Sequence, residues 1–376
     1  MKIYISKPSI VASAGFTKDF LKDMLSSKDS LNKEEFCEKE FIVGKVKDEL
    51  LDTKFKFKDS FKTRTNLIAL SALLPLQDDV LKLIKKYGKN SIGVVIGTTT
   101  AGVEENFKTS FNNGVFDINN FNLEKNSLAN PAIFIREFFG LENVAYSVST
   151  ACTSGIKSII EASNLIKSGI CKAVITGGVD SLNSLTLFGF NSLSILSSKK
   201  CLPFSKYRDG TNLGEGASFM IVSADEISDI SVKFAISNND AYHMTTPRQD
   251  GFFQTKLIND TINVIGDIDY INLHATGTQT NDAMESLAIY NSKTKAKCSG
   301  VKNLVGHTLG AAGAIEIGLC SLILDTKLAP KQVIKDYDDS LKPINFVNSN
   351  FKVPIKNAMS LSFAFGGDNA LMVVGK

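Results

Sequence analysis

Short apolar runs alternate with longer segments of mixed polarity over most of the chain, and each kind of segment predicts a different element. The apolar runs predicted to be strands span residues 91–97, 144–150, 173–177, 219–223 and 268–273. Several of them are apolar at consecutive positions, as parallel strands are when helices cover both faces of a sheet. The mixed segments predict helices over residues 152–167, 254–265, 281–291 and 309–325, and two strands, 359–365 and 370–374, close the chain around a Gly-Gly turn. This alternation indicates an α/β fold with layered sheets.

A coarse internal symmetry accompanies this alternation. In each half a strand is followed by a reactive side chain and then by a helix that opens with small residues. SVSTACTSGIKS surrounds Cys152, and SGVKNLVGHTLGAAGAIE surrounds His307. Between them lies the polar segment DEISDI, which has the composition of a surface connection. We therefore expect two similar halves, residues 1–225 and 226–376.

Composition narrows the class of protein. Of the 376 residues 43% are hydrophobic, too many for a chain that stays disordered. Lys+Arg (42) and Asp+Glu (39) leave a net charge of +3, which is not the footprint of a nucleic-acid-binding protein. No apolar run comes close to the ~20 residues that a membrane-spanning helix needs. The six cysteines form no C-x-x-C pair and the N-terminus has no secretory pattern, so we expect a cytoplasmic protein without a zinc ribbon.

Cys152 is the first candidate for chemistry. It follows a predicted strand and opens a predicted helix, the place where α/β folds expose side chains to ligands. A helix N-terminus stabilises negative charge, which favours a thiolate over a free thiol with its pKa of about 8.5. The alternative is a small buried side chain, the usual fate of a free cysteine. Position alone leaves both interpretations open, whereas Cys171 and Cys320 fall within predicted elements and are expected to be structural.

Two of the three histidines lie in segments rich in Gly, Thr and Ala. His274 ends the strand 268–273 and begins a loop of threonines, and His307 precedes a helix whose first turns consist largely of Gly and Ala. Such bare backbone lets a ligand or another helix come close. Lys302 and Glu316 flank His307 and are either an ion pair across a site or two surface charges. For His274 the alternative is a hydrogen-bonded place in the core.

A fourth segment, SFAFGGDNA (362–370), either presents a backbone N–H to a ligand or forms an ordinary hairpin turn. Taken in order, the four segments resemble the β-ketoacyl-acyl-carrier-protein synthases, the elongating decarboxylative condensing enzymes of the thiolase-like fold. The motifs that carry the resemblance are S-T-A-C-T-S-G at 149–155, H-A-T-G-T-x-x-N-D at 274–282, K-N-x-x-G-H-T-x-G-A-A-G at 302–313 and F-x-F-G-G at 363–367. Segments 96–106, 176–182 and 208–219 also resemble the family, so the likeness covers nearly all of the chain from about residue 90.

The resemblance implies a five-layered αβαβα fold and a decarboxylative Claisen condensation. Cys152 would accept the acyl chain as a thioester. His274 and His307 would polarise the carbonyl of a malonyl thioester and promote loss of CO₂. The resulting enolate would attack the acyl group on Cys152 and lengthen a fatty-acyl or polyene chain by two carbons. Lys302, paired with Glu316, would set the electrostatics around His307.

The resemblance implies binding roles as well. The backbone N–H groups of the nucleophile and of Phe365 would form an oxyanion hole, and Phe365 would also gate the acyl pocket. Thr276 and Thr278 would hydrogen-bond the phosphopantetheine arm, while Thr100 and Phe190 would line the acyl pocket. No metal and no cofactor is expected.

The implied partner is an acyl carrier protein, which delivers acyl and malonyl groups on phosphopantetheine and docks by charge steering. The candidate docking residues are Lys62, Arg64 and Lys125. The family also implies a homodimer, or a heterodimer with a catalytically silent relative. The chain departs from the usual motifs at Ala275, Ala364 and Asp368. With the segments GGVDSL, LFGFNSL and NNDAYHM, these departures resemble the synthases of aryl-polyene pathways more than the housekeeping elongases.

Two other classes of protein are the alternatives. A chain-length-factor-like partner subunit shares the fold but characteristically lacks the nucleophile, which is present here as Cys152. A cysteine hydrolase would use Cys152 with one histidine and would leave Lys302 and the second histidine without a role. An initiating synthase characteristically has Asn in place of one histidine, so the pair of histidines favours the elongating type.

Overall fold

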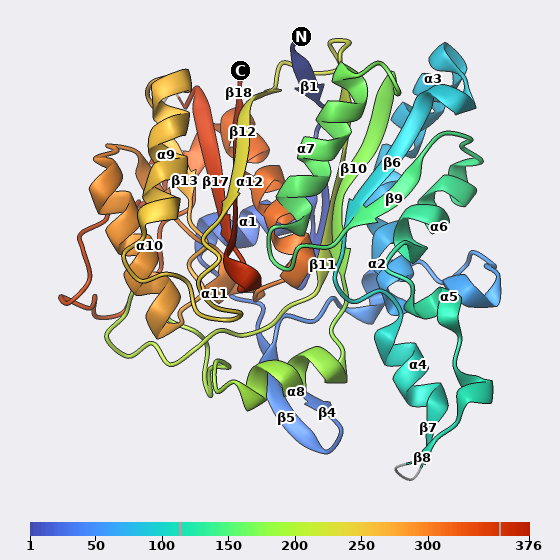
Figure 1. Ribbon diagram of the computed structural model, residues 1–376, viewed down its shortest axis with the longest axis horizontal. Coiled ribbons are helices and arrows are strands. Elements are labelled where there is room, and N and C mark those ends of the chain that lie inside the picture. The colour runs from blue at the N-terminus through green and yellow to red at the C-terminus, as the bar shows by residue number, and fades with distance from the viewer. Residues whose placement is uncertain (113–114, 353–354) are drawn as a thin grey trace.

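One sheet of 12 strands runs through the molecule in the computed structural model, which describes residues 1–112, 115–352 and 355–376 (Figure 1). The strands before residue 225 are β1 (Ile3–Ile5), β2 (Ser9–Ala12), β3 (Gly15–Phe16), β6 (Ile92–Gly97), β9 (Ala145–Val148), β10 (Ala173–Asp180) and β11 (Gly216–Ser223). The later strands are β12 (Ser231–Asn239), β13 (Tyr270–Asn272), β14 (Lys297–Ser299), β17 (Asn357–Phe363) and β18 (Asp368–Gly375). β1 pairs with both β11 and β12 and so joins the two sets of strands.

The two sets of strands repeat one topology. Their orders are β9-β6-β10-β11-β2 and β14-β13-β17-β18-β12. In both sets the first three strands are parallel, and the fourth is antiparallel to both of its neighbours. The same order with the same directions shows that the fold consists of two similar halves, as predicted. The boundary at residue 225 itself stays a prediction.

Helices complete five layers around the sheet. α7 (Ser154–Lys167) and α12 (Ala312–Thr326) lie side by side between the two halves of the sheet and pack on strands of both. The outer face of the first half is covered by α2 (Arg64–Leu73), α3 (Gln77–Tyr87) and α6 (Asn130–Phe139). The outer face of the second half is covered by α9 (Phe252–Ile265) and α10 (Gln279–Ser292). The predicted αβαβα arrangement is therefore confirmed.

The apolar sequence of α12 suits its place in the central layer. A helix that is apolar on all sides is stable in water only where neighbours cover it all round. Among the described residues one helical window, Leu309–Thr326, is apolar enough by length and composition to cross a membrane, with a mean hydropathy of 1.5. Since 83% of that window is buried inside the protein, its composition is that of a core helix. A Cβ on Gly155 of α7 would lie 2.5 Å from the Ala314 nitrogen, so the two central helices approach each other through glycine.

All the predicted strands and helices are present, with ends shifted by a few residues. The strand predicted over 359–365 ends at Phe363, because the chain then turns through Gly366 (φ 80°) and Gly367 (φ 72°). The helix predicted over 309–325 begins as a 3₁₀ turn, Leu309–Ala311. The remaining elements are α1 (Thr17–Ser26), α4 (Val103–Ser110), α5 (Leu123–Asn126), α8 (Ser184–Ser192), α11 (Lys302–Val305), β4 (Asn32–Phe36), β5 (Lys39–Val43), β7 (Phe111–Asn112), β8 (Val115–Phe116), β15 (Leu328–Ala329) and β16 (Phe351–Lys352).

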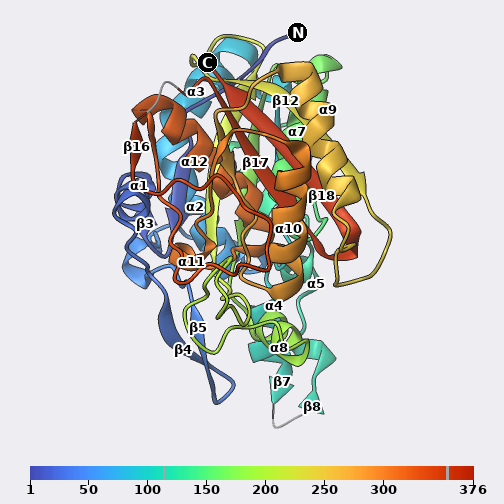
Figure 2. The ribbon, with the colours of Figure 1, turned by 90° about the vertical axis from the view of Figure 1, so that its left-hand side faces the viewer.

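Five of these elements project from the body of the molecule. The hairpin β4–β5, helix α8 and the pair β7–β8 lie at the end opposite to the two chain termini (Figures 1 and 2).

Candidate active site

Cys152 lies in the turn between β9 and α7. Ala151, directly before it, has a φ of 52°, a left-handed conformation that residues other than Gly adopt rarely. The Ser154 hydroxyl donates to the Ala151 carbonyl (2.6 Å) and accepts from the Thr150 amide (2.9 Å), which holds the turn. Strained turns of this kind persist where the surrounding structure determines them, and they are frequent at functional sites.

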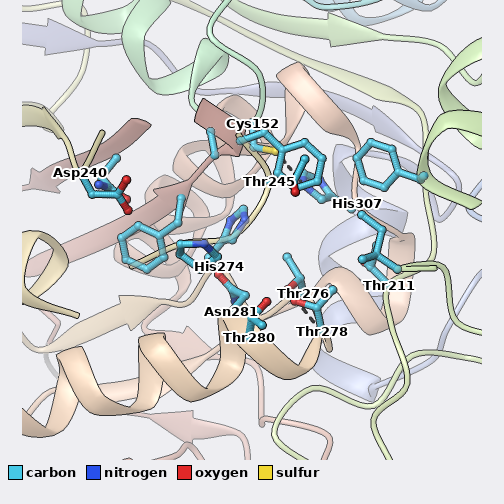
Figure 3. Close-up of a pocket in the computed structure, with 17 residues that line it drawn as sticks. Cys152, Thr211, Asp240, Thr245, His274, Thr276, Thr278, Thr280, Asn281 and His307 are labelled. Carbon is cyan, nitrogen blue, oxygen red and sulfur yellow. Dashed lines mark hydrogen bonds between the residues drawn. The ribbon is translucent and has the colours of Figure 1, made fainter. Parts of the chain in front are cut away.

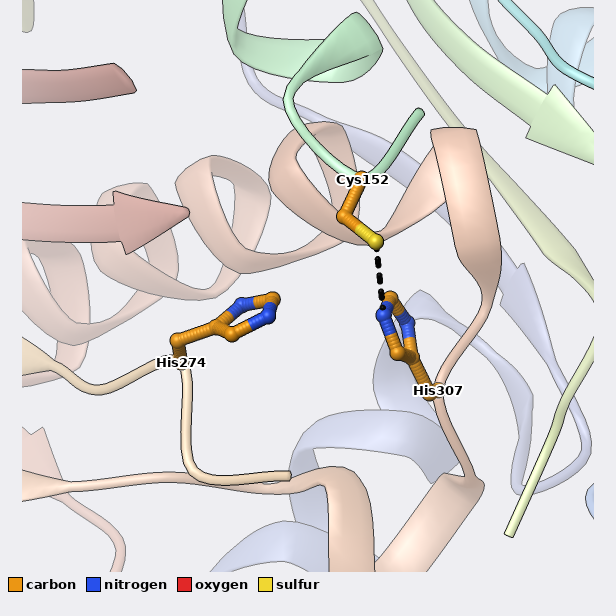
Figure 4. A group of neighbouring side chains, drawn as sticks. All are labelled: Cys152, His274 and His307. Carbon is orange, nitrogen blue, oxygen red and sulfur yellow. Dashed lines mark hydrogen bonds between the residues drawn. The ribbon is translucent and has the colours of Figure 1, made fainter. Parts of the chain in front are cut away.

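His307 and His274 face the thiol from the second half of the fold (Figure 4). His307 lies between α11 and α12, and its Nε2 is 3.0 Å from Cys152 Sγ. His274 follows β13, and its ring centre lies 5.4 Å from that of His307, with the planes at 89°. All three side chains are buried, and the sulfur and one ring nitrogen of each histidine lie within 4.8 Å of one another. The structure thus brings together three candidate residues from segments up to 155 positions apart.

Hydrogen bonds to Nδ1 determine the tautomer of both histidines. The Leu309 amide donates to His307 Nδ1 (3.2 Å). The Lys302 ammonium, which has no acceptor capacity, donates to His274 Nδ1 (3.3 Å). Burial and the charge of Lys302 hold the pKa of both imidazoles well below the usual 6.5, so both are neutral. A neutral imidazole whose Nδ1 accepts carries its proton on Nε2, and both Nε2–H groups therefore donate into the pocket.

Lys302 is held in turn by an ion pair with Glu316 of α12. Both side chains are at most 3% exposed. Burial raises the pKa of Glu316 to about 7, and the lysine ammonium opposes that rise. Of the two arrangements considered from the sequence, the structure contains the buried pair and not the two surface charges. Because an isolated buried charge is costly, each partner depends on the other.

The Cys152 thiol is neutral in the resting site. Burial raises its pKa to about 12, and the ammonium of Lys302 offsets that effect only in part. The helix N-terminus therefore does not by itself make Cys152 a thiolate, contrary to the expectation from its position. The resting site instead holds a neutral thiol beside two neutral N–H donors, which are available for negative charge that develops on a substrate.

The thiol and the two imidazoles line a pocket of about 620 Å³, its open mouth included (Figure 3). Phe190 and Phe365 stack in its wall, with ring centres 5.4 Å apart and planes at 22°. Thr276 and Thr278 also line it, with their hydroxyl oxygens 3.0 Å apart. The lining residues that the sequence did not single out for the pocket are Ile195, Thr211, Asp240, Thr245, Pro247, Thr280, Asn281, Phe363, Ala364 and Asn369. A mostly apolar pocket with a few convergent polar groups is typical of a small-molecule site.

Two buried carboxylates hold the loops of the site, and neither was among the predicted residues. Glu285 of α10 accepts from the amides of His274 (2.7 Å) and Ala275 (2.8 Å), and burial raises its pKa to about 8. Asp180 at the end of β10 accepts from the hydroxyls of residues 98–100, from the amides of residues 99 and 100, and from the Gly310 amide, three residues after His307. The available signal was an acid within the segments TGGVDSL and HATGTQTNDAMES. A buried acid that accepts from backbone amides positions the chain around it.

Thr100 lies away from the pocket. Its amide (3.0 Å) and its hydroxyl (2.8 Å) both donate to Asp180, and it is not among the residues that line the pocket of this chain. The contribution of Thr100 to an acyl site therefore stays a prediction.

The structure changes the interpretation of the docking candidates. The Arg64 guanidinium binds the buried Glu215 carboxylate (2.6 Å), so Arg64 supports the core rather than offering a charge to a partner. Lys125 pairs with Asp59 (2.9 Å), and its side chain is only 12% exposed. These ion pairs weigh against both residues as docking sites, and they were not expected because Glu215 and Asp59 lie far away in the sequence. Lys62 is the most exposed of the three, with a side chain 62% exposed in a loose surface pair with Asp59 (3.8 Å), and its role in docking stays a prediction.

The cluster of Cys152, His274 and His307 has the donor types of a zinc site. Coordination through Nε2 would require the imidazole proton to move to Nδ1. At both histidines Nδ1 already accepts, from the Leu309 amide and the Lys302 ammonium. The hydrogen bonds of these residues therefore do not fit a bound metal.

Fold and site together define a class: a thiolase-like protein with a buried cysteine and two imidazole donors. Two family models match the chain, the beta-ketoacyl synthase N-terminal domain over residues 76–226 and the C-terminal domain over residues 230–334. The 3-oxoacyl-[acyl-carrier-protein] synthase 2 of Coxiella burnetii is 30% identical over 319 residues, 76% of this chain and 75% of the relative. The protein of the same name from Staphylococcus aureus (strain COL) is 33% identical over 251 residues, 60% of each chain. The chain belongs to the beta-ketoacyl synthase family.

Solved structures agree with this assignment. A chain from the complex of the ketosynthase ApeO with its chain length factor ApeC, from Xenorhabdus doucetiae, matches with a TM-score of 0.91 and 30% identity. The match covers 100% of this chain and 98% of that one. The resemblance predicted from the motifs and the predicted fold are therefore both confirmed.

Proposed function

We propose that the protein is an elongating β-ketoacyl-acyl-carrier-protein synthase, which joins an acyl group on Cys152 to two carbons of malonyl-acyl-carrier protein with loss of CO₂. The observation that carries this proposal is the pair of Nε2–H donors of His274 and His307 beside one thiol in a buried pocket. Donors that converge on one point are what a thioester carbonyl needs when it takes on the negative charge of an enolate.

The first half-reaction loads the nucleophile. The sulfur of Cys152 attacks the carbonyl carbon of the acyl thioester, the phosphopantetheine sulfur leaves, and the proton of the Cys152 thiol passes to that departing sulfur. The backbone N–H groups of Cys152 and Phe365 donate to the carbonyl oxygen while it carries negative charge.

The second half-reaction forms the carbon–carbon bond. In the bound malonyl thioester the bond from C2 to the carboxylate breaks, CO₂ leaves, and the electron pair becomes an enolate whose oxygen accepts from His274 and His307. C2 then attacks the acyl carbonyl on Cys152, and the cysteine sulfur leaves and takes up one proton from solvent. Lys302 and Glu316 act through His274, because the Lys302 ammonium donates to Nδ1 of that imidazole and so keeps the imidazole proton on Nε2.

The substrate arrives on an acyl carrier protein. Thr276 and Thr278, whose hydroxyls face the pocket, hydrogen-bond the phosphopantetheine arm. Phe190 and Phe365 contact the acyl chain where it enters.

The functional unit is a dimer, either of two copies or with a related subunit. β9 lies at the end of the sheet, and an open sheet edge needs cover. The second half of α4 and the segment that follows it expose an apolar ridge, which a partner would also cover. This ridge consists of Phe107, Phe111, Val115, Phe116, Ile118 and Leu123.

The proposal also covers the biosynthetic pathway of the protein and its cellular compartment. The departures at Ala275, Ala364 and Asp368 support the aryl-polyene branch, and so does the likeness to a chain of the ApeO–ApeC complex. The six free cysteines are typical of a reducing compartment and support a cytoplasmic location.

Mass spectrometry of the protein with acyl-carrier and malonyl-carrier substrates tests this function. We expect the acyl group on the Cys152 peptide and a product two carbons longer, and neither with Cys152→Ala. Cys201→Ala is the matched control, because burial raises the pKa of that thiol to about 12 as well, but Cys201 does not line the pocket. No acylation by a competent carrier would favour a chain-length-factor-like subunit. Acylation followed only by release of the free acid would favour a hydrolase.

A further inference from the structure

Asp368 is a charged residue at the edge of the site that the reaction above does not use. It is the first residue of β18, directly after the turn Phe365–Gly367. Its Oδ1 lies 2.6 Å from Lys157 Nζ, on the helix that begins at the nucleophile. The two side chains are 16% and 20% exposed, so solvent screens this pair less than a surface pair.

The second oxygen of the same carboxylate contacts the turn that carries the nucleophile. Asp368 Oδ2 accepts from the hydroxyl of Thr153, the residue directly after Cys152. The Thr153 hydroxyl also lies near the Thr150 carbonyl, but it has one proton, and an ionised carboxylate is the stronger acceptor. Asp368 therefore connects the turn of Phe365 to both ends of the first turn of α7.

Uncharged hydrogen bonds also hold the turn of Phe365. The Ala364 amide donates to the Asp368 carbonyl (2.7 Å), and the Gly366 amide donates to the Met244 carbonyl (2.7 Å). The carbonyls of the two glycines accept from the end of β12, from the residue after it and from β18: Asn239 Nδ2 to Gly366 (3.0 Å), and the Asp240 amide (2.8 Å) and Asn369 Nδ2 (3.0 Å) to Gly367. Around Gly366 an added Cβ would meet no atom within 4 Å, so open space lies next to the turn. Across the pocket wall the ring of Phe365 stacks on that of Phe190. The ion pair is the one charged restraint among these contacts.

We infer that Asp368 is a positioning residue: by binding Lys157 and Thr153 it latches the turn that carries Phe365 to the nucleophile helix, and so limits the entry of bulky groups to the pocket. This inference rests on the proposed function only where it assigns that entry to acyl chains. The latch itself concerns access to the Cys152 sulfur, which can be measured without any condensation.

Alkylation of Cys152 by two maleimides of different size tests the latch. N-methylmaleimide and N-(1-pyrenyl)maleimide share one reactive group, and the rate at the Cys152 peptide is read by mass spectrometry. Asp368→Asn keeps the size of the side chain and removes its charge, and Lys157→Gln breaks the same pair from α7, which serves if the first variant does not fold. We expect either variant to raise the bulky-to-small rate ratio about tenfold. The double variant should raise it no further, because the two residues act as one unit.

Glu34→Gln is the matched control, since Glu34 pairs with Lys45 (3.0 Å) on the projecting hairpin, away from the pocket. It should leave the ratio unchanged. An unchanged ratio in both Asp368→Asn and Lys157→Gln overturns the inference. So does an equal rise for both reagents together with a lower unfolding temperature, which indicates general loosening. A raised ratio in a protein that does not elongate would support the latch and reject the proposed function, so the two can fail separately.

Discussion

Removing the Lys302 ammonium tests whether the buried charges of Lys302 and Glu316 depend on each other. Lys302→Met keeps an unbranched apolar side chain but leaves the Glu316 carboxyl buried without its partner. Breaking a buried ion pair by removing one partner costs about 3–5 kcal/mol. We therefore expect the free energy of unfolding to fall by about that amount at pH 8.5.

The loss should depend on pH with a defined sign. The pKa of Glu316 is about 7 with Lys302 present and rises further without it, whereas the unfolded chain has the ordinary value of 4.5. The native variant then keeps a proton that the unfolded chain has released, so its stability falls as pH rises towards the folded pKa. Above pH 7 the native wild type has released this proton too. The difference in stability should therefore grow by about 1.4 kcal/mol per pH unit above pH 7.

Urea unfolding at pH 6, 7 and 8.5, followed by circular dichroism, measures these differences. Lys302→Met/Glu316→Leu removes both charges and should restore stability to near wild type or above. Condensation should stay lost in this double variant, because His274 Nδ1 still lacks its donor. Lys45→Met, which breaks a pair 33% exposed on both sides, is the control and should cost under about 1 kcal/mol. A stability loss equal at pH 6 and 8.5, or a double variant that condenses, would refute the reasoning.

Three further outcomes concern packing, pH and assembly. Gly155→Ala puts a Cβ 2.5 Å from a backbone atom of the neighbouring helix and should lower the free energy of unfolding by about 1–3 kcal/mol. At Gly189 an added Cβ meets no atom within 4 Å, so Gly189→Ala should raise the free energy of unfolding by about 0.5–1 kcal/mol. Urea titration measures both changes. Because the pKa values of both active-site imidazoles are well below 6.5, both stay neutral as pH falls through 6.5, and an NMR titration of either imidazole with a midpoint there would contradict this. Phe116→Asp should produce monomers in light scattering, and Leu81→Asp, also at a site 47% exposed, should not.

The residues of the chemistry could be predicted because each is marked locally. Cys152 and His307 precede helices built on small residues, and His274 ends a strand. These local signals do not show how deeply a residue is buried. The position of Cys152 at a helix start predicts a lowered pKa, yet burial raises it to about 12. Desolvation depends on every neighbour in space, which a local pattern does not describe.

Residues whose role depends on a distant partner were predicted less well. Arg64 was expected to face an acidic protein, but it binds Glu215, 151 positions away. Lys302 shows the opposite case, since its partner Glu316 is 14 positions along the chain and the pairing was recognised. A charge pattern predicts pairs within a short segment, while pairs between elements follow from the topology that brings those elements together.

The repeated topology explains why the site forms where it does. α7 and α12 occupy equivalent places and lie side by side, so the turns that precede them meet, and Cys152 and His307 come within 3.0 Å. His274 follows β13, whose counterpart in the first half is β6, followed by residues 98–100. Both loops are held in the same way, by a buried acid that accepts from two consecutive amides: Glu285 in the second half and Asp180 in the first. The loop in the second half presents His274 to the thiol. In the first half the threonine hydroxyls donate to Asp180 instead, and for that reason Thr100 is absent from the pocket although its motif resembles the family.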